Sequence, residues 1–165
     1  MLSNHFHFLL FCSAVFCLAL AGCSGEPKPD GLPKLYPVSL SFTQEGEPVK
    51  DASVRLVAVS ESQTNWSVGG STNATGTAAL KTYGKYPGVP EGKYKIVISK
   101  YEREQIGNAA SMYDAHGENT YDLIDPSFSS PQTTSLTVDV EPGKKSYDPI
   151  DLGKKIRQPI KKPGE

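Results

Sequence analysis

Apolar and polar residues alternate along several short segments of this chain, the pattern of half-buried β-strands. In the first segment, Val38, Leu40 and Phe42 alternate with Ser39 and Ser41. Comparable patterns predict strands at 52–58, 66–72, 77–83, 93–100, 134–140 and 147–152, with proline, glycine and asparagine in the turns between them. No segment after the first 22 residues has the period of an amphipathic helix. We therefore expect an all-β fold, a seven-stranded Greek-key β-sandwich with no helix beyond the N-terminal segment.

Three residues have structural roles in this prediction. The run Asn73-Ala74-Thr75-Gly76 predicts a tight turn, in which Gly76 supplies the positive φ. Gly92 closes the turn before strand 93–100. Tyr94 faces inward from that strand, and its hydroxyl is expected to reach the backbone as a tyrosine corner does.

The N-terminal segment has a different character. Residues 8–20 are apolar apart from Ser13, a stretch too short to cross a bilayer, which takes about 20 residues. It ends in Leu20-Ala21-Gly22-Cys23, which resembles the lipobox of bacterial lipoproteins. The resemblance implies that 1–22 is a signal peptide and that Cys23 carries acyl chains inserted in membrane lipid. It also implies that the protein is membrane-anchored, at the outer membrane or on the periplasmic or cell-surface side. An ordinary secretory signal with a chance cysteine is the alternative, because a cut there would also suit the small residues Ala21 and Gly22. Residues 2–7 contain no Lys or Arg, which departs from the usual positive start of a signal peptide.

The remaining chain divides by composition. Residues 23–36 contain Pro27, Pro29 and Pro33 and predict a lipidated, Pro-rich tether. The β-sandwich domain is expected at 37–152, with an insertion at 101–133. The end, 153–165, is basic and interrupted by proline, and predicts a disordered tail that could rest on an anionic surface.

Residue counts exclude several kinds of chemistry. Cys12, Cys17, His5 and His7 all lie in the predicted signal peptide, so Cys23 and His116 are the only cysteine and histidine after cleavage. A Cys/His zinc site or a catalytic Cys–His pair cannot form. A net charge of −1 argues against nucleic acid as a partner. We therefore expect no catalytic residue, no metal and no cofactor, and a monomer that is not an enzyme.

The insertion at 101–133 is long for a connection in a compact domain, and such loops are often binding surfaces. It carries Tyr113, His116 and Tyr121, which with Trp66 form the candidate ligand surface. A solvated insertion, or one with a short strand of its own, is the structural alternative. The pattern Asp114-x-His116-x-Glu118 could bind a metal, but Gly117 favours a turn there. Trp66 could stack on a sugar ring or belong to the core.

The middle of the chain contains three recognisable segments, Gly46-Glu47-Pro48-Val49-Lys50-Asp51-Ala52-Ser53-Val54, Thr72-Asn73-Ala74-Thr75-Gly76-Thr77 and Val89-Pro90-Glu91-Gly92-Lys93-Tyr94-Lys95-Ile96. With these segments the chain resembles the transthyretin-like modules called carboxypeptidase regulatory-like domains. The layout is similar to that of small planctomycete-type lipoproteins. These motifs form turns and parts of the core, and they do not indicate a reaction or a ligand.

The resemblance implies a lipid-anchored, non-catalytic binding or scaffold module of the cell envelope, with an envelope protein or a polysaccharide as partner. A carbohydrate-binding protein or a secretion or assembly accessory is the alternative. A transthyretin-like hydrolase fits less well, because that family needs several histidines and a C-terminal Tyr-Arg-Gly-Ser, whereas this chain ends Lys162-Pro163-Gly164-Glu165.

Overall fold

The computed structural model describes residues 28–60, 66–106, 117–144 and 146–160. The chain divides into two compact units, Met1–Leu32 and Pro33–Glu165. The predicted signal peptide and Cys23 lie outside the described residues. Within the described ranges, no helix combines the length and apolar character needed to cross a membrane.

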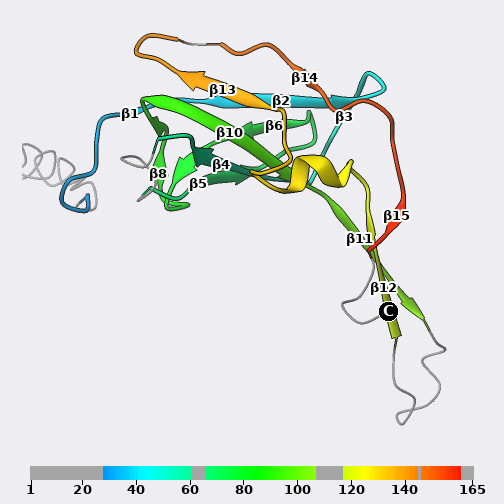
Figure 1. Cartoon of the computed structure of the whole chain (residues 1–165). Helices are drawn as coiled ribbons and strands as arrows, with labels where there is room; N and C mark the ends of the chain where they lie inside the picture. The colour runs from blue at the N-terminus through cyan, green and yellow to red at the C-terminus, as the bar shows by residue number, and fades with distance from the viewer. Residues whose placement is uncertain (1–27, 61–65, 107–116, 145, 161–165) are drawn as a thin grey trace, which may run out of the picture. The chain divides into compact units, whose positions relative to one another are not determined.

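The second unit is all-β, as predicted, but it has more than the expected seven strands (Figure 1). The largest sheet has the strand order β13-β10-β4-β5-β7-β8. Its strands are β4 (Ser53–Ala58), β5 (Val68–Ser71), β7 (Lys81–Thr82), β8 (Tyr86–Pro87), β10 (Gly92–Ser99) and β13 (Thr137–Val140). All of its neighbouring pairs are antiparallel.

A second sheet is built on β2 and has the order β14-β2-β3, with β6 also paired to β2. Its strands are β2 (Ser39–Gln44), β3 (Glu47–Pro48), β6 (Thr77–Ala79) and β14 (Ile150–Asp151). The edge strand predicted at 147–152 is the two-residue β14, and it pairs with β2 in parallel.

Two smaller sheets complete the unit. One pairs β1 (Leu35–Tyr36) with β9 (Val89–Pro90), and the other has the order β11 (Tyr101–Ile106), β12 (Gly117–Asp122) and β15 (Gln158–Pro159). The described residues contain no α-helix, as predicted, and the helical turn among them is the short 3-10 helix η3 (Pro126–Ser129). Asp125 caps it by accepting a hydrogen bond from the Ser127 amide at 2.9 Å.

One apolar core joins the two larger sheets. Alternate residues of β2, β4 and β10 point into it, as the sequence pattern predicted. The buried members on these strands are Leu40, Phe42, Val54, Leu56, Tyr94, Ile96 and Ile98. Because one face of each strand is buried, a one-residue slip in register would expose the whole set.

The segment predicted as one strand at 77–83 is two strands in different sheets. β6 pairs with β2, whereas β7 pairs with β5. Leu80 lies between them, is buried in the core, and donates its amide to the carbonyl of Val38 at 2.9 Å. The chain therefore crosses from one sheet to the other at Leu80.

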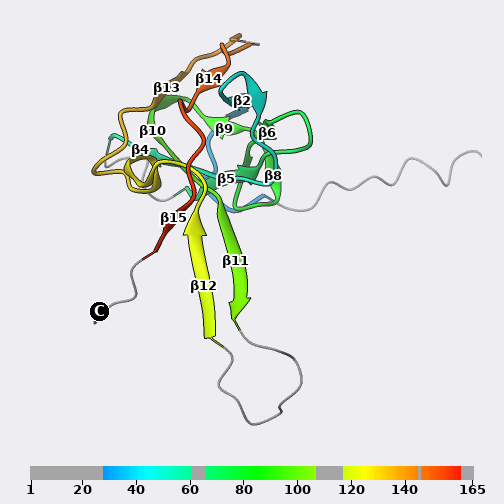
Figure 2. The same cartoon turned by 90° about the vertical axis from the view of Figure 1, so that its right-hand side faces the viewer.

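The insertion at 101–133 contains two different structures. β11 and β12 form an antiparallel hairpin that extends away from the two larger sheets (Figure 2). We call these two strands the arm. After the arm the chain returns to the body, where Ile124 is buried in the core and Phe128 packs against it. The insertion is thus a projecting hairpin followed by a segment that belongs to the core.

Both predicted boundaries of the domain shift in the structure. The tether predicted at 23–36 ends earlier, because β1 pairs with β9. The expectation of a disordered tail at 153–165 does not hold for 153–160, because β15 pairs with β12. Lys154 also accepts a hydrogen bond at its carbonyl from Gln44 Nε2 at 3.3 Å. Backbone pairing orders these residues despite their basic, Pro-containing sequence.

The predicted turn at 73–76 forms. The Asn73 side-chain oxygen accepts hydrogen bonds from the amides of Thr75 and Thr77, at 2.9 and 3.0 Å. Gly76 has a φ of 74°, and a Cβ there would lie 2.6 Å from the Phe42 carbonyl oxygen. Glycine is therefore required both for the backbone conformation and for contact with β2.

Tyr94 has the contact expected of a tyrosine corner. Its side chain is 1% exposed, and its hydroxyl donates a hydrogen bond to the Pro90 carbonyl at 2.9 Å. Burial raises the pKa of Tyr94 to about 12. Gly92, between the two partners, begins β10 with a φ of 145°.

Replacing Gly76 by alanine should destabilise the domain more than the same change at Gly46. Both glycines have positive φ, and a left-handed non-glycine residue costs about 1–2 kcal/mol. Only Gly76→Ala adds an overlap with backbone, since a Cβ at Gly46 would meet nothing within 4 Å. Denaturant unfolding of both variants measures the difference, and equal losses would contradict the close approach to β2.

Tyr94→Phe should lower the free energy of unfolding by about 1 kcal/mol, because it leaves the Pro90 carbonyl unpaired. The pH dependence gives a second measurement. The unfolded phenol ionises near pH 10.0 and the buried one near 12, so the contribution of Tyr94 is complete below pH 10 and is lost as the pH rises toward 12. The phenylalanine variant should lose less stability across that window. An unchanged melting temperature at neutral pH would argue against the corner role.

Candidate functional site

One face of the arm gathers polar side chains from both of its strands. Glu102 and Glu104 are two residues apart on β11, so they point to the same side of the hairpin. Their cross-strand partners on β12 are Tyr121 and Asn119. The Asn119 side-chain amide donates to the Tyr121 hydroxyl at 3.4 Å.

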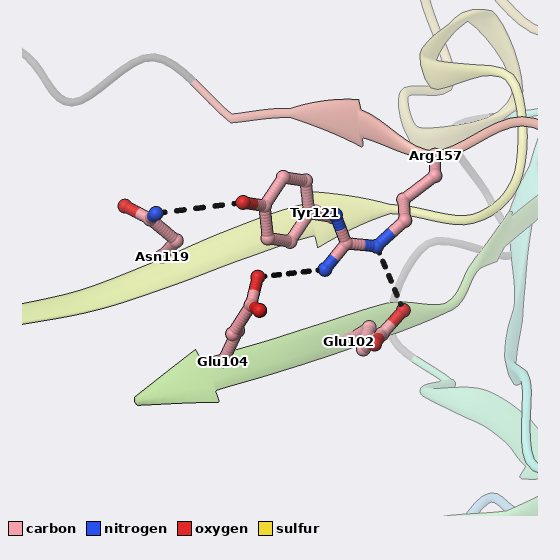
Figure 3. Close-up of polar contacts among 5 residues, drawn as sticks. All are labelled: Glu102, Glu104, Asn119, Tyr121 and Arg157. Atoms are coloured by element: carbon pink, nitrogen blue, oxygen red, sulfur yellow. Dashed lines mark hydrogen bonds and ion pairs between the residues drawn. The ribbon is translucent and has the colours of Figure 1, made fainter. Parts of the chain in front are cut away.

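Arg157, which precedes β15, lies over this face (Figure 3). Its Nη2 contacts Glu104 at 2.8 Å and its Nε contacts Glu102 at 3.3 Å. The guanidinium carbon is 3.5 Å from the centroid of the Tyr121 ring. One planar cation thus holds two carboxylates and an aromatic face together. We call Arg157, Glu102, Glu104 and Tyr121 the latch.

The latch is electrostatically satisfied. The hydrogen bond from Arg157 holds the pKa of Glu104 below its usual value, and the carboxylates of Glu104 and Glu102 raise the pKa of Arg157. Its charged side chains are about half exposed, so salt screens the ion pairs. The role of the latch is therefore structural, because its ion pairs connect the C-terminal segment to the arm.

The predicted ligand surface is only partly within the described residues. Tyr121 lies in the latch, where Arg157 covers one face of its ring. Tyr113 and His116 lie outside the described residues, as does Asp114. Glu118, the third member of the candidate metal pattern, forms an ion pair with Arg103 at 3.4 Å. In the described part of the chain, no group of three or more His, Cys, Asp or Glu residues could hold a metal ion.

Trp66 is neither a core residue nor fully exposed, the two positions considered for it from the sequence. It is partly exposed and is not a member of the core, and its ring meets that of Tyr83 edge to face, with centroids 5.8 Å apart. Tyr83 is 48% exposed. Trp66 lies two residues before β5, and Tyr83 directly follows β7. The Tyr83 amide donates to the Ser67 carbonyl at 2.7 Å.

A groove of about 570 Å³ lies on strands β4, β5 and β7. Its polar lining consists of serines and two cations: Ser53, Ser67, Ser71, Arg55 and Lys81. Gly69 forms part of the floor between the cations. Ser67 and Gly84 also line it and are the chain neighbours of Trp66 and Tyr83, so the groove adjoins the aromatic pair.

No protein-family model, curated protein or solved structure matches this chain.

The sequence prediction singled out Tyr121 and Trp66 but not the charged residues beside them. Glu102 and Glu104 show the period-two spacing of a strand face, which was the available signal for the latch. Arg157 looked like one cation among several in a solvated tail. Nothing in the sequence near Gly69 indicates that Arg55 and Lys81 lie on either side of it.

Arg157→Gln should release β15 from the arm without unfolding the body. The Ile160 amide donates to the Thr120 carbonyl at 2.9 Å, so its hydrogen exchange should become faster in the variant. Arg103→Gln is the matched control, because it removes an ion pair from a neighbouring residue of β11 that points to the other face. Equal exchange at Ile160 in the wild type and in Arg157→Gln would contradict the latch.

Proposed function

We propose that this protein is a lipid-anchored lipoprotein of the bacterial cell envelope, in which a non-catalytic β-domain acts as a binding or scaffold module. The observation that carries the proposal is the run Leu20-Ala21-Gly22-Cys23 after an apolar segment. The division of the chain supports it, since the second unit, which contains the β-domain, begins at Pro33, shortly after the candidate acylation site. Acyl chains on Cys23 would insert in membrane lipid on the outer membrane or the cell-surface side, each buried methylene contributing about 0.8 kcal/mol.

The binding role is supported by two surfaces on this body. The arm extends away from the larger sheets, and its charged residues face solvent (Figure 2). The groove on β4, β5 and β7 lies on the sheet face opposite the core. A tethered module of this kind works by contact with an envelope protein or a polysaccharide, as a monomer and without turnover of a substrate.

We also propose that the body is a Greek-key sandwich of the transthyretin-like, carboxypeptidase regulatory-like type. The turn at Gly76 and the hydrogen bond from Tyr94 to Pro90 support this, because both fall in the motifs that carry the resemblance. The additional short strands and the arm would then be elaborations of a seven-strand frame.

One observation favours a second function, that of an assembly accessory. β11 is an edge strand, because the sheet order is β11-β12-β15. Its outer backbone groups could pair with an extended segment of a partner protein. Alternating charges at Glu102, Arg103 and Glu104 weaken this alternative, since charged side chains protect edges from pairing.

Metabolic labelling with an alkyne fatty acid tests the anchor. The full-length protein, expressed in a lipoprotein-processing bacterium, should incorporate the label and fractionate with membranes, whereas Cys23→Ala should do neither. Cys17→Ala is the matched control and should behave as the wild type. Mass spectrometry should find Cys23 as the acylated first residue. Label retained in Cys23→Ala, or an intact leader with a free thiol at Cys23, would contradict the proposal.

A further inference from the structure

We infer that the groove on the outer face of β4, β5 and β7 binds an acidic polysaccharide, with Arg55 and Lys81 contacting its anionic groups and the Trp66–Tyr83 pair contacting a sugar ring. The inference deepens the binding role proposed above and rests on it. It names the class of ligand that this surface would recognise.

The register of three strands places the two cations on either side of a glycine. Arg55 pairs with Gly69, and Gly69 pairs with Lys81. Adjacent strands lie about 4.8 Å apart, so the two cationic residues are separated by about 10 Å across the sheet. Because cross-strand partners point to the same face, both side chains leave the sheet on the groove side, away from the buried neighbour Val54.

The charged side chains that line the groove are all positive. Among the described residues, its lining contains Arg55 and Lys81 and no aspartate or glutamate. Both cations are exposed, and neither forms an ion pair with a described residue. Arg157 differs from both, because it forms ion pairs with the carboxylates of Glu102 and Glu104. A protein of net charge −1 that leaves two cations unpaired around one groove favours an anionic ligand there.

The floor of the groove admits a ligand close to the backbone. Gly69 has no side chain, and a Cβ there would lie 2.9 Å from the Val54 carbonyl oxygen, so any larger residue would require the two strands to move apart. Serine hydroxyls line the groove on both sides of Gly69, at Ser67 and Ser71. Hydroxyl groups can donate and accept hydrogen bonds, as the hydroxyls of a sugar do.

The aromatic pair is held in place by an unusual turn. Tyr83 and Gly84 have φ values of 53° and 67°, and the Lys85 amide donates to the Thr82 carbonyl at 3.2 Å. The loop between β7 and β8 has three residues, Tyr83 to Lys85, because Thr82 pairs with Tyr86. Glycine and asparagine adopt a positive φ more readily than tyrosine does. A bulky residue at positive φ is strained, and such strain persists mainly where function requires the residue. The Tyr83 ring is therefore presented beside the groove at a cost to backbone stability.

These features together favour a glycan over other anions. A small anion needs neither an open groove across three strands nor an aromatic pair at its end. Nucleic acid would call for a basic excess that the chain lacks. An acidic glycan uses every feature, because it carries carboxylates or sulfates, hydroxyls and ring faces that pack on aromatic side chains.

Trp66 provides the measurement, because it is the single tryptophan of the chain. Full-length protein in detergent is titrated at low salt with polygalacturonate, dextran sulfate, neutral dextran and a single-stranded oligonucleotide, and Trp66 fluorescence is recorded. We expect polygalacturonate or dextran sulfate to change the emission and neutral dextran to leave it unchanged. The two acidic probes distinguish carboxylate from sulfate recognition, and either result supports the inference. Tighter binding of the oligonucleotide than of both acidic glycans would overturn it.

Arg55→Gln/Lys81→Gln should weaken acidic glycan binding by about tenfold or more. Arg103→Gln/Lys155→Gln removes the same charge from surfaces outside the groove and should retain the wild-type affinity. Equal losses in the two double variants would show attraction by overall charge and would overturn the inference.

Tyr83→Asn provides a test that does not change the charge. Asparagine tolerates a positive φ better than tyrosine does, so the variant should fold while losing the ring. Weaker glycan binding by a folded Tyr83→Asn supports the inference, and unchanged affinity overturns the role of the aromatic pair. The anchor is tested separately: acylated Cys23 with no acidic glycan bound would overturn this inference alone, whereas selective binding with unmodified Cys23 would overturn the anchor alone.

Discussion

The structure depends on the burial of one apolar layer between β10 and β2. Tyr94, Ile96 and Ile98 point into it from β10, which is hydrogen-bonded on both edges, to β4 and to β13. Fully burying a side chain of this size contributes about 1.5–3 kcal/mol. The layer fixes the register of β4 against β10, and through β4 the positions of β5 and β7. The outer-face residues of these strands are therefore placed by residues on the opposite face.

The latch and the groove differ in whether their charged side chains are already paired within the protein. In the latch, one arginine satisfies two carboxylates and covers an aromatic ring, so the cluster holds the arm and the C-terminal segment together. In the groove, Arg55 and Lys81 have no carboxylate between them. The same physical chemistry thus separates a contact that the protein makes with itself from one that, in our proposal, it offers to a ligand.

Local patterns in the sequence predicted the strands that have one buried face. Alternation identified β2, β4 and β10, and the turn at Gly76 and the hydroxyl contact of Tyr94 followed from residue chemistry. The crossing of the chain from one sheet to the other at Leu80 could not be predicted. Alternation shows that a residue faces the core, but it does not show which sheet its strand joins. Arg157 meets Glu102 across 55 residues, and Arg55 meets Gly69 only through strand register. Both clusters depend on pairings between distant segments, which a single sequence does not encode in any local pattern.

Native-state hydrogen exchange, resolved by residue across the full chain, tests most directly the claim that one layer centred on β10 carries the fold. The account predicts the slowest exchange for the amides of β10 and its neighbour β4, which open only when the domain unfolds. The arm should exchange much faster, because it pairs only with β15 at one edge of a small sheet. Arm amides as strongly protected as those of β10 would contradict the account.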